Sequence, residues 1–195
     1  AGSIIHSLND EQNIFKMGGL WKKIPITYVL MLIGTFALTG IPYLSGYFSK
    51  EMIVNSALES NLFLSDFFYL LSIFIIFLTS VYSFRLIFLV FHGKTKIPYN
   101  KFNSIKESSF ITIFPMIILG TFAIFSGFFL KDYFIDNQYY GLWVTSNVFY
   151  NEIDFSHHTS KFLSILPTIF VFLGIILCSY IYFSKNKFLD YIFYN

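Results

Sequence analysis

Four long apolar runs, separated by polar stretches, divide the chain. They cover about residues 24–58, 62–91, 109–130 and 162–183. A helix needs roughly 20 apolar residues to cross a bilayer, so each run is long enough to span one. No alternation of apolar and polar positions competes with this pattern. The pattern predicts an all-α integral membrane protein with four transmembrane helices, forming one membrane domain over residues 1–195.

The first apolar run is interrupted by Gly-Ile-Pro-Tyr-Leu-Ser-Gly at 40–46. Pro42 cannot donate a backbone hydrogen bond, and Gly46 accepts dihedral angles that other residues avoid. A continuous helix over this run would be about 50 Å long, more than the roughly 30 Å of a hydrocarbon core. We therefore predict that the first helix is discontinuous, with a break near 42–46.

Prolines also occur in the third and fourth runs. Pro115 and Pro167 fall in the early turns of the predicted helices. At the start of a helix a missing N–H costs little, so neither proline is expected to disturb its span.

Lysines are distributed unevenly between the two ends of the predicted helices. Segments facing the cytoplasm or the mitochondrial matrix are enriched in Lys and Arg, so the lysine-rich end and both termini are expected on that side. The lysine-poor end carries only Lys50, Lys131 and Lys161. The lysine-rich end carries Lys16, Lys22, Lys23, Lys94, Lys96, Lys101, Lys106, Lys185 and Lys187.

Composition narrows the class of protein. The chain is 55% hydrophobic and only 12% charged, which excludes an ordinary soluble domain, and its net charge of +2 does not favour nucleic acid binding.

The single cysteine, Cys178, cannot form a disulfide within the chain. The adjacent pair His157 and His158 lacks the spacing of metal ligands, so no metal is expected. The 27 Phe and 14 Tyr, both with AT-rich codons, favour an organelle genome.

Lys50 has two interpretations. It lies next to the predicted break, where irregular backbone is tolerated only if protein or water covers it. An ionisable residue in such a place is a candidate for an ion or proton path. Alternatively, Lys50 ends a shorter span and extends its ammonium group to the interface. Glu51 follows it but does not share its face of the helix, and it is a candidate for the water-exposed exit of a path.

Arg85 is the second charged residue within an apolar run. It lies near the lysine-rich end of the second span, where its side chain could reach water. Alternatively it faces the interior of the bundle, with Thr79, Ser80 and Tyr82 supplying hydroxyls to a hydrated path. The guanidinium stays charged, so those hydroxyls or waters would have to relay the proton.

The chain resembles the antiporter-like subunit of respiratory complex I, called chain 5 of NADH–ubiquinone oxidoreductase in mitochondria and chain L in bacteria. The similarity is dense over residues 1–94 and rests beyond them mainly on hydropathy. It is carried by Ala1-Gly-Ser-Ile-Ile-His6, Glu11-Gln12, Lys16-Met-Gly-Gly-Leu20, Lys23-Ile-Pro25, Gly46-Tyr-Phe-Ser-Lys50, Tyr82-Ser-Phe-Arg85-Leu-Ile-Phe and Phe91-His92-Gly93-Lys94.

This resemblance implies a role for Lys50. The matching lysine of the family lies on a discontinuous helix and belongs to the proton route toward the outer face. Arg85 matches a family arginine on the next helix, and the resemblance leaves open whether it is in the path or structural. The family usually has aspartate after the lysine, and often a second acidic residue, where this chain has Glu51 and Met52.

The resemblance also implies a setting. The chain would cover about the last third of the family's length, as a fragment or one product of a split gene. Its partners would be the other membrane-arm subunits, lipids and a segment or polypeptide carrying the N-terminal helices. It would be part of H⁺-translocating NADH:ubiquinone reductase, with no catalytic residues and no cofactor of its own, since flavin, iron–sulfur clusters and quinone belong to other subunits.

The resemblance leaves alternatives of function and location open. A cation/proton antiporter subunit, not coupled to electron transfer, also fits the order Lys-Glu-Met at 50–52. A membrane scaffold is a third possibility, in which Lys50 serves assembly. The expected location is the mitochondrial inner membrane with both termini in the matrix, and the alternative is a bacterial plasma membrane with cytoplasmic termini.

Overall fold

The computed structural model describes residues 2–59, 63–93, 95, 97–134 and 161–183. All regular elements in these ranges are helical, which confirms the predicted all-α membrane fold. In chain order they are α1 (Gly2–Ser7), η1 (Ile14–Lys16), η2 (Leu20–Lys22), α2 (Pro25–Thr39), α3 (Ser45–Glu59), α4 (Ser65–Ile87), η3 (Phe88–His92), α5 (Tyr99–Ser104), α6 (Phe110–Phe134) and α8 (Lys161–Phe183).

Three described helices are long and apolar enough to cross a membrane. They are Ser65–His92, Phe110–Leu130 and Leu163–Phe183. The predicted first span is discontinuous, as expected, and is made of two shorter helices, α2 and α3, of 15 residues each. Each is about 22 Å long, less than the roughly 30 Å of a hydrocarbon core, so only the two together have the length of a span.

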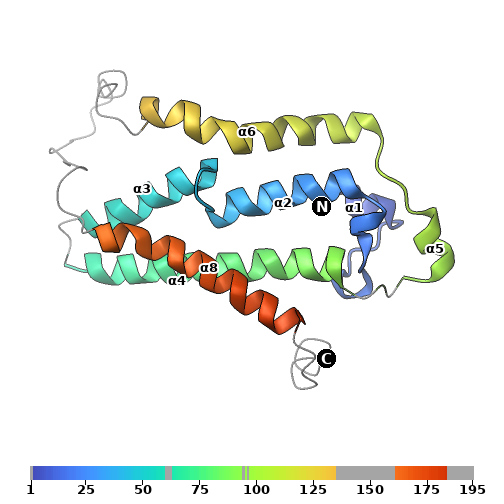
Figure 1. Cartoon of the computed structure of the whole chain (residues 1–195), viewed down its shortest axis with the longest axis horizontal. Helices are drawn as coiled ribbons and strands as arrows, with labels where there is room; N and C mark the ends of the chain where they lie inside the picture. The colour runs from blue at the N-terminus through green and yellow to red at the C-terminus, as the bar shows by residue number, and fades with distance from the viewer. Residues whose placement is uncertain (1, 60–62, 94, 96, 135–160, 184–195) are drawn as a thin grey trace.

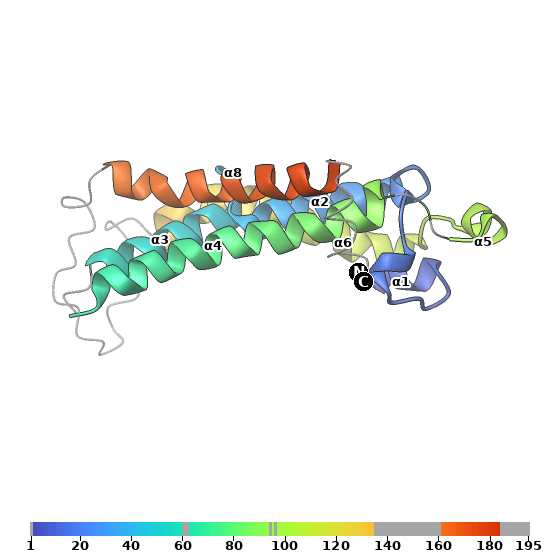
Figure 2. The same ribbon diagram turned by 90° about the horizontal axis from the view of Figure 1, so that it is seen from below.

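The broken helix lies in the middle of the bundle. Figure 1 shows α2 and α3 end to end, flanked by α6 on one side and α4 on the other. Helix α8 crosses α4, and Figure 2 shows it as a separate layer over this row. The short helices α1 and α5 gather at the end of the bundle where α2 begins and η3 ends.

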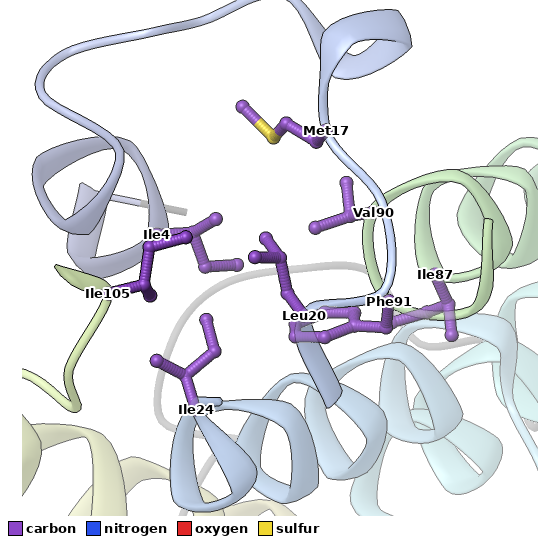
Figure 3. Close-up of a cluster of buried hydrophobic side chains, with 8 residues drawn as sticks. All are labelled: Ile4, Met17, Leu20, Ile24, Ile87, Val90, Phe91 and Ile105. Carbon is purple, nitrogen blue, oxygen red and sulfur yellow. The ribbon is translucent and has the colours of Figure 1, made fainter. Parts of the chain in front are cut away.

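Two buried apolar clusters hold the two ends of the bundle. The first, drawn in Figure 3, joins the N-terminal connector to α2, η3 and the segment before α6 through Ile4, Met17, Leu20, Ile24, Ile87, Val90, Phe91 and Ile105. The second joins α3, α4 and α8 at the opposite end through Val54, Tyr69, Ile73, Ile76 and Val171. Helix α8 enters only the second cluster, and it also packs along α4 and against η3, where Phe88 makes ring contacts with Tyr182 and Phe183.

The start of α2 is capped from a distant part of the chain. Its N-cap residue, Ile24, has no side chain that can accept a hydrogen bond. The Glu107 carboxylate, from the segment before α6, accepts the backbone N–H groups of Ile26 and Thr27 at 3.2 and 3.1 Å, and also the Thr27 hydroxyl. The negative carboxylate satisfies free N–H groups and complements the positive end of the helix dipole.

Replacing Glu107 with alanine is expected to lower stability by about 1–2 kcal/mol, because it removes a charged cap from a half-buried helix start. The measurement is the thermal midpoint of the purified assembly that contains the chain. Glu11→Ala is the matched control, since Glu11 pairs with Lys16 at 3.1 Å on an exposed surface and such pairs contribute little. Equal midpoints for the two variants would contradict the capping role.

Both predicted helix prolines lie at nearly the depth in their helices that the sequence suggested. Pro115 is inside α6 and Pro167 is inside α8, each past the first turn. A proline in a helix interior removes a hydrogen bond to the carbonyl four residues earlier. Pro167 therefore deprives the Leu163 carbonyl of its usual donor, and the low cost expected for both prolines stays a prediction.

Candidate functional site

Helix α2 ends at Gly40, whose left-handed φ of 82° only glycine adopts readily. The Gly40 N–H donates to the Ala37 carbonyl at 3.2 Å, and the Ile41 N–H donates to the Phe36 carbonyl at 3.1 Å. This pair of bonds is the Schellman motif, which satisfies carbonyls at a helix end. The helix therefore stops before Pro42, so the break occupies 40–44, slightly upstream of the predicted 42–46.

A tight turn connects the two halves of the broken helix. The Leu44 N–H donates to the Ile41 carbonyl at 3.3 Å, with Pro42 and Tyr43 at the central positions. Tyr43 has φ 72°, an uncommon value for a residue other than glycine, and its side chain is exposed. Proline followed by a residue of positive φ is the arrangement of a type II turn. Pro42 thus shapes the turn rather than ending α2.

Gly46 serves a different purpose from the one its sequence position suggested. It lies within α3 and is not among the described glycines of positive φ, so the expected unusual dihedral is not observed. A Cβ at this position would lie 1.8 Å from the Ala37 carbonyl oxygen. The missing side chain lets the first turn of α3 lie directly against the last turn of α2.

Lys50 reaches back across the break to the end of α2. A Cβ placed on Gly40 would lie 3.1 Å from Lys50 Cδ, so the lysine stem passes over the helix end. Its Nζ donates to Thr79 Oγ1 of α4 at 3.5 Å, the long end of the hydrogen-bonding range. The negative end of the α2 dipole favours an ammonium group here. Within the described ranges, no carboxylate lies within 4.0 Å of Lys50.

A small cavity opens beside Lys50. Its volume of about 20 Å³ is enough for roughly one water molecule. Glu51 lies on the same wall, and Tyr47, one turn earlier, also lines the cavity. The cavity is lined by Thr39, Gly40, Tyr47, Lys50, Glu51, Ile76, Ser164, Pro167, Thr168 and Val171. Helices α2, α3, α4 and α8 therefore meet at this point.

Arg85 does not join this cavity. It is six residues beyond Thr79 on α4, about 9 Å further along the helix axis. Its guanidinium carbon lies 5.7 Å from the centre of the Phe15 ring in η1, at the lysine-rich end of the bundle. Lys50 and Arg85 thus occupy different levels of the structure.

The hydroxyl groups predicted around Arg85 are only partly in the bundle interior. Ser80 is fully buried, but the Tyr82 side chain is 53% exposed in the described bundle. Ser83 is buried in its place and donates to the Thr79 carbonyl at 2.7 Å. A residue two positions after Ser80 falls on the other side of the helix, so the role of Tyr82 in a hydrated path stays a prediction.

Several site residues were missed by sequence reasoning. The Gly40 helix stop carried a recognisable signal, since glycine followed two residues later by proline is typical of a helix end. Ser164, Thr168 and Tyr69 carried none, because nothing in an apolar run tells which face of one helix packs on another.

Metal binding has no support among the described residues, where no group of three His, Cys, Asp or Glu side chains comes together. The pair His157 and His158 lies outside those residues, as does most of the polar connection between α6 and α8.

Two family models match adjacent parts of the chain. Residues 1–75 match the family described as NADH:quinone oxidoreductase/Mrp antiporter, transmembrane region. Residues 82–193 match the family described as NADH dehydrogenase subunit 5 C-terminus. The boundary between the two matches falls within α4, so the broken helix lies in the first match and α6 and α8 lie in the second.

Similar proteins agree with these matches. The NADH-ubiquinone oxidoreductase chain 5 of Acanthamoeba castellanii is 37% identical over 210 residues, covering 100% of this chain and 30% of the relative. That of Dictyostelium discoideum is 38% identical, covering 96% and 28%. That of Chondrus crispus is 44% identical over 140 residues, covering 69% and 21%. The chain thus spans less than a third of these relatives and belongs to the NADH dehydrogenase subunit 5 family, whose C-terminal region it matches.

Proposed function

We propose that the chain is part of the proton-translocating membrane arm of NADH:ubiquinone oxidoreductase, with Lys50, half-buried in the described bundle, as a proton station. One observation carries this proposal. At the break between α2 and α3, Lys50 and Glu51 line one small cavity together with side chains of α8. A basic and an acidic group beside one water-sized space are suited to passing a proton.

The chemistry follows from the surroundings of Lys50. Burial disfavours the ammonium form, while the C-terminal end of α2 and the Thr79 hydroxyl oxygen favour it. These opposing influences let the lysine change its protonation state when its neighbours move. A proton released into the cavity would be accepted by water or by the Glu51 carboxylate, and Glu51 would deliver it toward the lysine-poor face.

Arg85 would act differently in this scheme. A guanidinium group stays protonated, so Arg85 cannot itself carry the transferred proton. Its place near Phe15 suits a fixed positive charge that orients hydroxyls and water on the lysine-rich side of the route. Flavin, iron–sulfur clusters and quinone would be held by other subunits.

The proposed location is the mitochondrial inner membrane. Acanthamoeba castellanii and Dictyostelium discoideum are eukaryotes, and their similar proteins are named chain 5 of NADH-ubiquinone oxidoreductase. The excess of lysine at one end of the bundle favours that end, with both termini, on the matrix side. The partners would be other membrane-arm subunits, lipids and the segment or polypeptide that corresponds to the rest of the relatives' length.

Lys50→Met in the assembled complex tests the proposal. Methionine keeps much of the side-chain volume and removes the proton-carrying group, so fewer protons should be pumped per electron. The measurement is the proton-to-electron ratio in sealed vesicles, normalised to the amount of assembled complex. The control is Lys22→Met, because Lys22 is exposed at the opposite end of the bundle. An unchanged ratio in Lys50→Met would refute the assignment.

A cation/proton antiporter subunit is the alternative function. One observation favours it, because the family description matched by residues 1–75 includes such antiporters. Purification separates the two: co-migration with an assembly that oxidises NADH excludes a free antiporter. A purely structural scaffold would instead show normal pumping per assembled complex when Lys50 is replaced, with less complex formed.

A further inference from the structure

We propose that Tyr69 is a positioning residue for the Lys50 site, because its hydroxyl replaces the backbone hydrogen bond that Pro167 removes from α8. The proposal rests on the proposed function of Lys50 and adds a device that holds the α8 wall of the cavity. It concerns three groups: the proline ring, the carbonyl it leaves without a helix donor, and a hydroxyl from a neighbouring helix.

The first step concerns the backbone of α8. In a regular helix the N–H of residue 167 would donate to the carbonyl of Leu163. Pro167 has no N–H, and its ring also pushes against that carbonyl. Within a membrane such a carbonyl needs another donor, because lipid cannot supply one.

The second step concerns the donor. The Tyr69 hydroxyl of α4 donates to the Leu163 carbonyl oxygen at 2.8 Å, a normal hydrogen-bond length. Tyr69 is only 5% exposed and packs in the cluster with Val54, Ile73 and Val171. The tyrosine is therefore fixed by packing, and its hydroxyl links α8 to α4 at one position along the helix axes.

The third step links this bond to the cavity. Ser164, Pro167 and Thr168 form the α8 wall opposite Lys50 and Glu51. Ser164 follows Leu163 directly, and Pro167 is one turn later, so the tethered carbonyl belongs to the same turn as this wall. Loss of the tether would let the first turns of α8 move away and enlarge a space that holds roughly one water molecule.

The test is a double-mutant cycle between Tyr69→Phe and Pro167→Ala in the assembled complex. Tyr69→Phe alone should slow coupled turnover about fivefold, the factor that corresponds to about 1 kcal/mol for one hydrogen bond. It should also shift the pH profile of turnover, because the surroundings of Lys50 and Glu51 change. Pro167→Ala restores the N–H to the Leu163 carbonyl, so Tyr69→Phe should have little effect in that background.

Two variants serve as matched controls. Tyr180→Phe removes a hydroxyl from an exposed tyrosine of α8, and Pro115→Ala removes a proline from the interior of α6. Neither residue touches the cavity, so neither variant should change the pH profile. All rates are normalised to the amount of assembled complex.

The outcomes separate this inference from the proposed function. The inference would be overturned if Tyr69→Phe had the same effect in the chain with Pro167 and in the Pro167→Ala variant. A normal rate and pH profile in Tyr69→Phe would also overturn it. Reduced assembly with unchanged turnover per complex would also overturn it, since the role would then be structural only. If Lys50→Met alters pumping while Tyr69→Phe does not, the inference alone fails. If Lys50→Met leaves the proton-to-electron ratio unchanged, the proposed function itself is refuted.

Discussion

Replacing Gly46 with alanine is expected to prevent stable packing of the broken helix and to reduce the amount of assembled complex severely. The new methyl group would lie 1.8 Å from the Ala37 carbonyl oxygen and 2.9 Å from the carbonyl carbon. Both are backbone atoms, which no rotamer change can move. Helices α2 and α3 would have to separate, at a cost of about 3 kcal/mol or more, the upper end of the usual range for overpacking.

The same movement would disturb the Lys50 site. The lysine stem passes over Gly40 at the end of α2, so separating the two half-helices changes the distance between the ammonium group and that helix end. The measurement is the yield of assembled complex on a native gel, followed by the proton-to-electron ratio of whatever assembles.

Gly34→Ala is the matched control for Gly46→Ala. Gly34 lies within α2 and has no described atom within 4 Å of the position of a new Cβ. Alanine is favoured over glycine in a helix by up to about 1 kcal/mol, so this variant should assemble normally. Similar yields for both variants would show that the close approach at Gly46 does not hold the break together.

Replacing Gly174 with alanine is the second change with a large expected effect. Gly174 lies where α8 crosses α4, and its new Cβ would lie 1.8 Å from Ser80 Oγ and 3.0 Å from the Phe77 carbonyl oxygen. Small residues let membrane helices approach closely where the hydrophobic effect cannot drive them together. We expect a loss of about 1–3 kcal/mol in stability, measured as a lower thermal midpoint of the complex.

A second-site variant makes this prediction specific. Ser80→Ala removes the hydroxyl oxygen with which the new Cβ of Gly174→Ala would clash. The double variant should therefore regain part of the lost stability. The Phe77 carbonyl remains close, so recovery should be incomplete. Gly120→Ala is the control, since its Cβ would meet only the end of the flexible Leu30 side chain, at 3.1 Å. A double variant no better than Gly174→Ala would contradict the proposed contact.

Much of the fold could be predicted because the bilayer limits what an apolar run can form. A run of about 20 apolar residues crosses the membrane as a helix, since every backbone group must be satisfied within it. The helices at Ser65–Ile87, Phe110–Phe134 and Lys161–Phe183 occupy the predicted second, third and fourth runs. The interruption after Gly40 was also visible, because proline and glycine are the residues that end helices.

The sequence predicted the region of the candidate site but not all of the residues that form it. Lys50 and Glu51 were identified because charged residues are rare beside an apolar run that breaks. The partners of Lys50 could not all be identified, since Ser164 and Thr168 are more than 100 residues away and ordinary members of an apolar segment. The exposed position of Tyr82 could not be predicted, because hydrophobic residues on every side of α4 hide which face is buried.

The sequence by itself determined the helical class, the number of apolar runs, the existence of a break and the charged residue beside it, because each follows from local backbone chemistry and from the energy of burying charge in lipid. Only the tertiary structure decided that α2 stops at Gly40, that Gly46 is needed for contact with Ala37, and that α8 closes the cavity at Lys50. These features depend on which helix faces meet. In lipid those faces are chosen by close packing and single hydrogen bonds, and neither leaves a periodic signal in the chain.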